Sequence, residues 1–321
     1  MSSPGSPDAP DAPDAPDAPT ATSAWASVGP AVLDHVALGV ERWSDAWPRY
    51  AVELGGEWWS GGFNVGFGPA QLRYANGARI EFLQPWDWED NPFLRRFLDR
   101  NGPGPHHLTF KVPDLAHALD AAGDAGFDPV GVDLSDPGWK EAFLHPRQAT
   151  GIVVQLAEST SDWSSPIPEE FPAERRRPPA SLERATHAVA DMDGALALFH
   201  DLLGGTVRGE GLADDGSWRW VDLAWSAPLS IRLVASVAPG DDNTVARFLD
   251  GRPGRLHHLS LSVDDPDLIR GAAPMERLIG VEPGPVWVVA PEGNLGTRLV
   301  LRSAPTPVPG RPRPLRAPRA T

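Results

Sequence analysis

The sequence predicts an α+β protein made of four similar units, arranged as paired βαβββ modules in two domains. Three observations support this prediction. A strand pattern containing histidine recurs at a nearly constant interval, each copy precedes further helix and strand signals, and a Pro- and charge-rich stretch separates the copies into two pairs. The 321 residues are enough for two domains that each bury a core.

The repeated segment is clearest at residues 33–40, Leu-Asp-His-Val-Ala-Leu-Gly-Val. Its alternation predicts a half-buried strand that directs His35 and small residues to the face opposite its valines and leucine. Copies follow around His107, Arg184 and His258, of which the Arg184 copy is the weakest. The interval is 72 positions from His35 to His107 and 74 from Arg184 to His258. A fixed period of this kind indicates duplicated modules.

Helix and strand signals after each copy complete the modules. We expect the first helix to run from a cap at Ser44 to Gly55, and the second to span residues 114–126. The predicted organisation is a disordered acidic Asp-Ala-Pro tail, a first domain, a linker, a second domain and a Pro/Arg-rich tail, at residues 1–30, 31–158, 159–181, 182–303 and 304–321.

Composition excludes several classes of function. The chain has 28 Lys+Arg against 43 Asp+Glu, a formal charge of −15, which disfavours nucleic acid and anionic membranes as partners. It contains no cysteine, so any metal must be bound through nitrogen and oxygen. No segment has the length and apolarity of a membrane span or a signal peptide. We therefore expect a cytoplasmic protein with a small-molecule substrate, for which a homodimer is a possible assembly.

Four polar side chains lie on predicted strands whose opposite faces are apolar: His35, Glu81, His107 and Gln155. The spacing from Glu81 to Gln155 is 74 positions, which matches the spacing of the modules. If the two modules pair with pseudo-twofold symmetry, these four side chains converge. Two imidazoles with a carboxylate and an amide oxygen suit one divalent ion such as Zn, Co, Ni, Mn or Fe. Each residue alone is better explained by strand structure, and the matched phase of the four favours a metal site.

The pattern resembles the vicinal oxygen chelate superfamily, which includes glyoxalase I, methylmalonyl-CoA epimerase, bleomycin-resistance proteins and extradiol dioxygenases. The stretches that carry the resemblance are 33–35, 80–85, 102–112 and 142–146. The likeness is good over residues 33–159 and weak over 182–303, and it is strongest to the epimerase and glyoxalase branch. It implies curved sheets around a metal held by the first and last strands of two modules, at His35, Glu81, His107 and Gln155.

Two departures from that branch concern its bases. The last ligand position is usually a glutamate there, whereas this chain has Gln155, whose amide cannot accept a proton at neutral pH. The segment Phe63–Phe67 contains no carboxylate where the epimerase has another base. Extradiol dioxygenases also place a glutamate on the final strand. Glu81 is thus the one carboxylate of the set and the candidate catalytic residue.

The second half is a degenerate copy of the first. Arg184, Arg232 and Val300 stand at the positions of His35, Glu81 and Gln155, and only His258 remains. We predict no metal there. The two arginines either bind an anion or form salt bridges with nearby carboxylates, and we favour the salt bridges.

Three functions fit these features. The first is a divalent-metal-dependent lyase or isomerase/epimerase that transfers a proton next to a carbonyl in a small oxygenated substrate. The second is a non-haem Fe(II) dioxygenase of the same fold. The third is a ligand-binding or resistance module that performs no chemistry.

Overall fold

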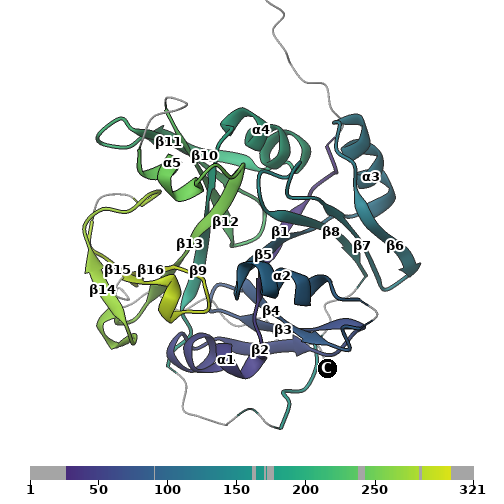
Figure 1. Ribbon diagram of the computed structural model, residues 1–321, viewed down its shortest axis with the longest axis horizontal. Coiled ribbons are helices and arrows are strands. Elements are labelled where there is room, and N and C mark those ends of the chain that lie inside the picture. The colour runs from purple at the N-terminus through teal and green to yellow at the C-terminus, as the bar shows by residue number, and fades with distance from the viewer. Residues whose placement is uncertain are drawn as a thin grey trace, which may run out of the picture.

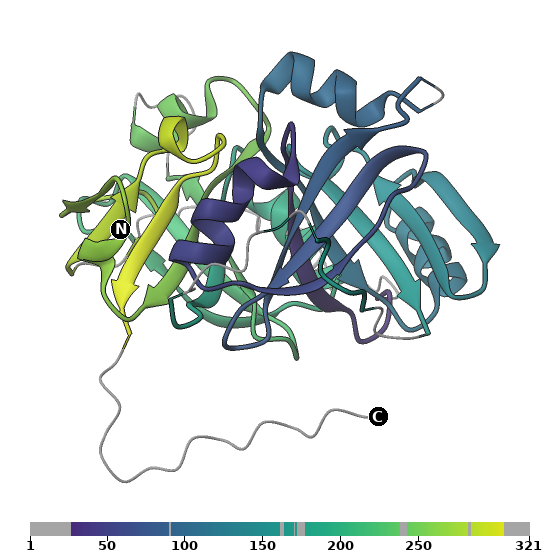
Figure 2. The same ribbon diagram turned by 90° about the horizontal axis from the view of Figure 1, so that it is seen from below.

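A computed structural model describes residues 27–89, 91–160, 164–169, 171, 177–237, 243–281 and 284–304. Most of both predicted tails and part of the predicted linker lie outside these residues. The described chain forms two eight-stranded sheets that lie side by side (Figures 1 and 2). Within the described residues, no helix is long and apolar enough to cross a membrane.

The first sheet contains two modules joined at its centre. Its strands are β1 (Val32–Gly39), β2 (Glu57–Gly61), β3 (Gly66–Arg73), β4 (Arg79–Trp86), β5 (Gly104–Lys111), β6 (Val130–Asp136), β7 (Trp139–Leu144) and β8 (Val153–Ser159). The order is β2-β3-β4-β1-β5-β8-β7-β6, with β1 antiparallel to β5 and each module's first strand parallel to its last. This arrangement confirms the predicted pairing of βαβββ modules, which brings the first and last strands of both modules together.

The second sheet repeats this plan. Its strands are β9 (Ser181–Val189), β10 (Thr206–Leu212), β11 (Trp218–Ala224), β12 (Ser230–Ser236), β13 (Gly254–Val263), β14 (Ala272–Met275), β15 (Val286–Val289) and β16 (Leu299–Ser303). The order β10-β11-β12-β9-β13-β16-β15-β14 is that of the first sheet, strand for strand. The predicted duplication is therefore present in the fold of both halves.

The helices are short and depart from the predictions in places. They are α1 (Trp43–Trp47), π-helix η1 (Pro48–Glu53), α2 (Phe93–Asn101), α3 (Leu115–Asp124), α4 (Met192–Leu196), π-helix η2 (Ala197–Leu202), α5 (Thr244–Leu249), and the 3₁₀ turns η3 (Pro266–Leu268) and η4 (Pro291–Gly293). The predicted cap at Ser44 is wrong, because Arg42 takes the extended N-cap conformation and Ser44 lies inside α1. In the fourth module, η3 takes the place of the helix.

Helix α2 lies between the two modules of the first sheet and was not predicted from the sequence. Its Leu94 and Leu98 pack against Ala37 of β1 and Leu83 of β4. These two residues point to the same sheet face as His35 and Glu81, so α2 covers one end of that face.

The two halves share one hydrophobic core. Phe110 of the first sheet packs with ring centroids 6.2 Å from Phe199 and 5.1 Å from Trp225. Asn294 in the second half donates a hydrogen bond of 2.9 Å to the Tyr50 hydroxyl. The halves are therefore held by apolar packing and by buried polar contacts.

The described part of the predicted linker packs against the first half. The Phe171 ring stacks on Trp47 with centroids 4.3 Å apart and is buried. Ser165 accepts a 2.9 Å hydrogen bond from the Trp58 indole through its backbone oxygen. These contacts cover α1 and the edge strand β2 from outside.

Candidate metal centre

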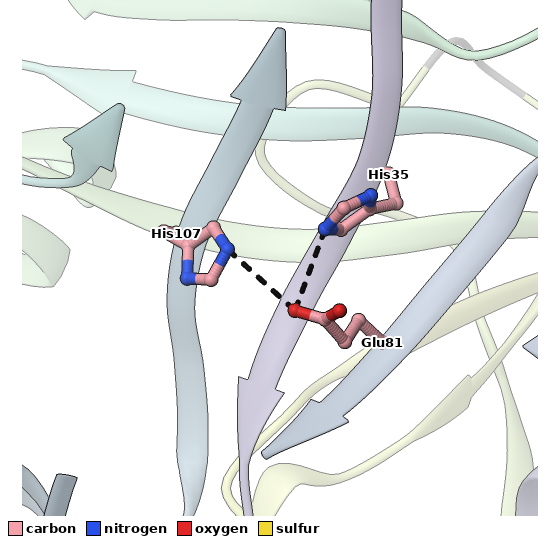
Figure 3. A group of neighbouring side chains, drawn as sticks. All are labelled: His35, Glu81 and His107. Atoms are coloured by element: carbon pink, nitrogen blue, oxygen red, sulfur yellow. Dashed lines mark ion pairs between the residues drawn. The ribbon is translucent and has the colours of Figure 1, made fainter. Parts of the chain in front are cut away.

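His35, Glu81 and His107 meet at the centre of the first sheet (Figure 3). Glu81 Oε2 lies 3.4 Å from His35 Nε2 and 3.7 Å from His107 Nε2, and one atom from each residue falls within 4.8 Å of the others. Four ligands at bonds of ~2.1 Å in a tetrahedron are about 3.4 Å apart. The separations from Glu81 are thus already close to those that a bound ion requires.

The sheet register explains this convergence. Ala37 of β1 pairs with Glu81 on the parallel strand β4 and with His107 on the antiparallel strand β5. Paired residues share a face of the sheet, so Glu81 and His107 lie on either side of the Ala37 methyl group. His35 is two positions before Ala37 on β1 and therefore points to the same face. The small side chain at Ala37 leaves the space between them.

Two β-bulges orient the imidazoles. The pairing of β1 with β5 shifts between Leu33 and His35, which puts Asp34 and His35 on one side of the strand. Asp34 Oδ2 then lies 2.8 Å from His35 Nδ1. A second shift next to Ala37 brings His106 Nδ1 within 2.8 Å of His107 Nδ1. The Nδ1 atoms of His35 and His107 are thus hydrogen-bonded to Asp34 and His106, and the Nε2 atoms of both rings face Glu81.

The two histidines differ in protonation. Burial opposes a charge on His35, but the Glu81 and Asp34 carboxylates outweigh it and raise the pKa of His35 to about 9. Burial and the neighbouring imidazoles hold the pKa of His107 well below its usual range. Burial of Asp34 is likewise outweighed by His35, Arg79 and Lys111, which lower the pKa of Asp34 to about 2. A cation at this centre would displace the His35 proton and meet His107 already neutral.

Gln155 lies beside this group and reaches it through Thr109. Thr109 Oγ1 donates to Gln155 Oε1 at 2.6 Å and lies 2.9 Å from His35 Nε2. The fourth predicted donor is therefore buried next to the other three, with a hydroxyl between its oxygen and His35.

Sequence reasoning missed three residues around the centre. Thr109 follows His107 by two positions and so shares its face, a signal that was available from the alternation. Gln71, which pairs with Glu81 across the β3–β4 hairpin, donates to Glu81 Oε1 at 3.1 Å. Glu141 on β7 accepts a hydrogen bond from Gln155 Nε2 at 2.7 Å.

The residues present fit a divalent cation. His107 Nε2 is buried, and no side chain among the described residues satisfies it with a well-formed hydrogen bond, so this nitrogen can serve as a ligand once it carries no proton. Two imidazole nitrogens, one carboxylate and an adjacent amide oxygen form a donor set that borderline divalent ions accept.

Comparison with known proteins gives the family of the first half. Residues 34–143 match the family model described as "Glyoxalase/Bleomycin resistance protein/Dioxygenase superfamily", the group also known as vicinal oxygen chelate proteins. The chain carries a vicinal oxygen chelate domain.

Two curated relatives resemble parts of the chain. The ethylmalonyl-CoA/methylmalonyl-CoA epimerase of Cereibacter sphaeroides is 29% identical over 131 residues, which cover 39% of this chain and 96% of that enzyme. The uncharacterized protein YqjC of Bacillus subtilis is 32% identical over 95 residues, 27% of this chain. That match spans 63% of the Bacillus protein's length.

A solved structure extends the likeness to both halves. A mutant of 4-hydroxymandelate synthase from Streptomyces coelicolor matches with a TM-score of 0.57 and 14% identity, over 85% of this chain and 93% of that chain. At this identity the match concerns the fold alone. This match and the shared strand order of the two sheets show the vicinal oxygen chelate fold in both halves.

The second sheet keeps the strand register of the first and loses three of the four donors. Thr186 pairs with Arg232 and His258 as Ala37 pairs with its two neighbours in the first domain. The residues at the positions of His35, Glu81, His107 and Gln155 are accordingly Arg184, Arg232, His258 and Val300.

Salt bridges and a loop occupy the corresponding face. Arg232 is buried and pairs with Asp222 at 2.6 and 2.5 Å, while Arg184 lies 3.4 Å from the same carboxylate. Arg232 also donates to the Gly280 carbonyl at 3.0 Å. Gly280 belongs to the long β14–β15 connection, and its neighbour Ile279 packs into a buried cluster on this face. The favoured interpretation of the two arginines as salt-bridged residues is therefore correct.

Proposed function

We propose that the first vicinal oxygen chelate domain is a divalent-metal-dependent enzyme of the lyase or isomerase/epimerase type. It would transfer a proton next to a carbonyl group in a small oxygenated substrate. The observation that carries this proposal is the convergence of two imidazole Nε2 atoms on one carboxylate oxygen, at 3.4 and 3.7 Å, in a buried site.

Four residues would hold the ion: His35, Glu81, His107 and Gln155. A bound divalent ion supplies a Lewis acid for two neighbouring substrate oxygens and favours the enolate form of the substrate. Because Gln155 is neutral, the set contributes a single negative charge from Glu81. A divalent ion thus leaves a net positive charge, which favours a substrate that carries or develops an anionic oxygen.

Glu81 would be the base as well as a ligand. Gln71 Nε2 holds its Oε1 atom at 3.1 Å, so Oε2 is the oxygen that faces the two imidazoles and the interior. Glu81 would move off the ion to take the proton from the carbon next to the carbonyl, and the proton would rest on Oε2 and return from the same atom. This one-base transfer needs no partner in Phe63–Phe67, where the chain has no carboxylate.

The similarity to the Cereibacter epimerase makes acyl thioesters the first substrates to test. Hydroxyketones and the hemithioacetals of α-oxoaldehydes follow, because each offers two neighbouring oxygens and an acidic carbon. Across these classes the same residues would perform the same proton transfer.

One observation favours a second candidate. His35, Glu81 and His107 alone form a two-histidine, one-carboxylate set, which is the set that non-haem Fe(II) oxygenases use. Oxygen consumption that depends on iron and is absent with zinc or cobalt would support a dioxygenase instead.

Another observation favours a binding module. The second domain retains the fold although three of its four donor positions hold arginine or valine, so this chain tolerates the fold without a complete metal set. Protein that binds an aromatic or cationic drug in the absence of any ion would support that function.

The test is elemental analysis of the full chain after chelation and reconstitution with each of five ions, Zn, Co, Ni, Mn and Fe. A screen of the three substrate classes follows. Glu81→Gln keeps the shape and an oxygen donor but cannot hold the proton, and we expect turnover to fall by roughly 10²-fold or more. Glu57→Gln, on the exposed edge strand β2, is the matched control and should retain activity. A chain that binds none of these ions contradicts the proposal.

A further inference from the structure

Glu141 holds the Gln155 amide from the side away from the metal centre. Its strand β7 is antiparallel to β8, and Phe143 pairs with Gln155, which places Glu141 two positions along on the same face. Glu141 Oε2 accepts hydrogen bonds from Gln155 Nε2 at 2.7 Å and from the Trp139 indole at 2.9 Å. A partly buried carboxylate is thus bound to two donors and directed at the amide.

These contacts define which end of the amide faces the ion site. A carboxylate only accepts hydrogen bonds, so the NH₂ end of Gln155 must be the end that meets Glu141. The amide oxygen then points to the interior, where Thr109 Oγ1 donates to it at 2.6 Å. Thr109 in turn lies 2.9 Å from His35 Nε2. Two contacts fix the orientation of the amide: its NH₂ group donates to the Glu141 carboxylate, and its oxygen accepts from the Thr109 hydroxyl.

We propose that Glu141 is a positioning residue that keeps Gln155 Oε1 directed at the metal centre. This inference rests on the proposed function, since it assigns Gln155 as an oxygen ligand. An amide nitrogen has no lone pair available for a cation, so a reversed amide would present N–H groups to the ion and cost the site its fourth ligand. Glu141 prevents this reversal without touching the ion.

Glu141→Gln tests the idea because an amide at this position pairs with Gln155 in either orientation. We expect the affinity for zinc or cobalt, measured by competition with a chelating dye, to fall by roughly 10–100-fold, the usual effect of losing an outer partner of a ligand. Glu158→Gln on the neighbouring strand removes a carboxylate that binds Lys140 and Leu115, and it should leave the affinity unchanged.

Exchanging the carboxylate and the amide between positions 141 and 155 should restore the metal affinity that Glu141→Gln loses. In the double variant Glu141→Gln/Gln155→Glu, the donor and acceptor exchange places across the same 2.7 Å contact. We expect metal affinity at least equal to that of the unmodified chain, whereas Gln155→Glu alone places two carboxylates in contact and should bind less than the double variant. Equal affinities for Glu141→Gln and the unmodified chain would overturn the inference.

A second readout separates this inference from the proposed function. In metal-free protein, the side-chain NH₂ signals of Gln155 in a ¹⁵N correlation spectrum, assigned by their loss in Gln155→Glu, should shift in Glu141→Gln and stay in place in Glu158→Gln. Unmoved signals overturn the positioning role. If the signals shift but the unmodified chain binds no ion, the proposed function fails while the hydrogen-bonded orientation of Gln155 stands.

Discussion

His187 Nε2 lies 2.8 Å from the backbone oxygen of Thr150, so a fully buried imidazole of the second domain donates a hydrogen bond to the first. Burial is the main influence on this ring and lowers the pKa of His187 to about 4, although the hydrogen bond to Thr150 acts in the opposite direction. The folded protein therefore keeps His187 neutral at a pH where the unfolded chain binds a proton.

This difference predicts acid sensitivity of the domain contact. The unfolded imidazole has a pKa near 6.5, so the free energy of unfolding is unaffected above that pH and falls as the pH drops from ~6.5 towards ~4. Between pH 7.5 and 5.5 we expect His187 to cost the folded state about 1 kcal/mol. Urea unfolding of His187→Gln, whose amide can still donate to Thr150, should lose this part of the pH dependence.

The control for this measurement is His117→Gln on α3, where the ring lies at the surface and bonds to the Ser27 backbone oxygen. It should reproduce the pH profile of the unmodified chain. If His187→Gln also reproduces that profile, the imidazole does not titrate between the folded and unfolded states as argued.

His35→Ala should remove bound metal from the chain. The substitution deletes one of the two imidazoles at the centre, and the methyl group of alanine cannot replace it as a ligand. We expect the reconstituted chain to hold about one divalent ion, and the variant to lose more affinity than the roughly 10–100-fold that outer partners contribute. Metal content by elemental analysis after gel filtration measures this.

His258→Ala is the matched control, because His258 occupies the position of His107 in the second sheet. Its neighbours there include the salt-bridged Arg232, so we expect the ion content to remain that of the unmodified chain. If His258→Ala lost the ion and His35→Ala kept it, the metal would lie in the second domain, which would contradict the proposed function.

Asp34→Asn should weaken metal binding through His35. The carboxylate holds His35 Nδ1 at 2.8 Å and pairs with Arg79, so it sets the ring orientation and makes Nε2 a stronger donor. We expect a roughly 10–100-fold rise in the dissociation constant for zinc. Asp45→Asn, in the exposed pair with Arg42, should bind like the unmodified chain. Equal affinities for the two variants would show that Asp34 has no influence on the ion.

Much of this site follows from strand alternation and from the repeat. Alternation assigns His35 and Glu81 to faces of their own strands, and the 72-residue interval from His35 to His107 indicates a duplicated module. Convergence then needs one assumption, the pairing of β1 with β5, which the sheet order bears out. The fold could be predicted from the sequence because strand alternation and the repeat are visible within each segment alone.

The remaining features depend on pairing between strands, which no single segment encodes. The bulges that turn Asp34 and His106 towards their neighbouring histidines arise from a shift in register, not from residue type. Glu141 becomes relevant only because β7 lies against β8 with Phe143 opposite Gln155. These contacts require the relative positions of segments, and composition and periodicity do not supply them.

The contact between Gly151 and Gly254 provides a last test of how the two domains are joined. Gly151 has a φ of +86°, and a Cβ added to it would overlap the Gly254 carbonyl group of the other domain. Gly77, in the β3–β4 turn, has a similar φ of +91°, but a Cβ there would meet nothing within 4 Å. Both substitutions to alanine incur the strain of a left-handed backbone, roughly 1–2 kcal/mol. Only Gly151→Ala must also push the two domains apart, at a further cost of about 1–3 kcal/mol. We therefore expect urea unfolding to give a clearly lower free energy for Gly151→Ala than for Gly77→Ala. Equal losses would mean that the backbone at this contact yields easily and that the domains are held mainly by the core around Phe110.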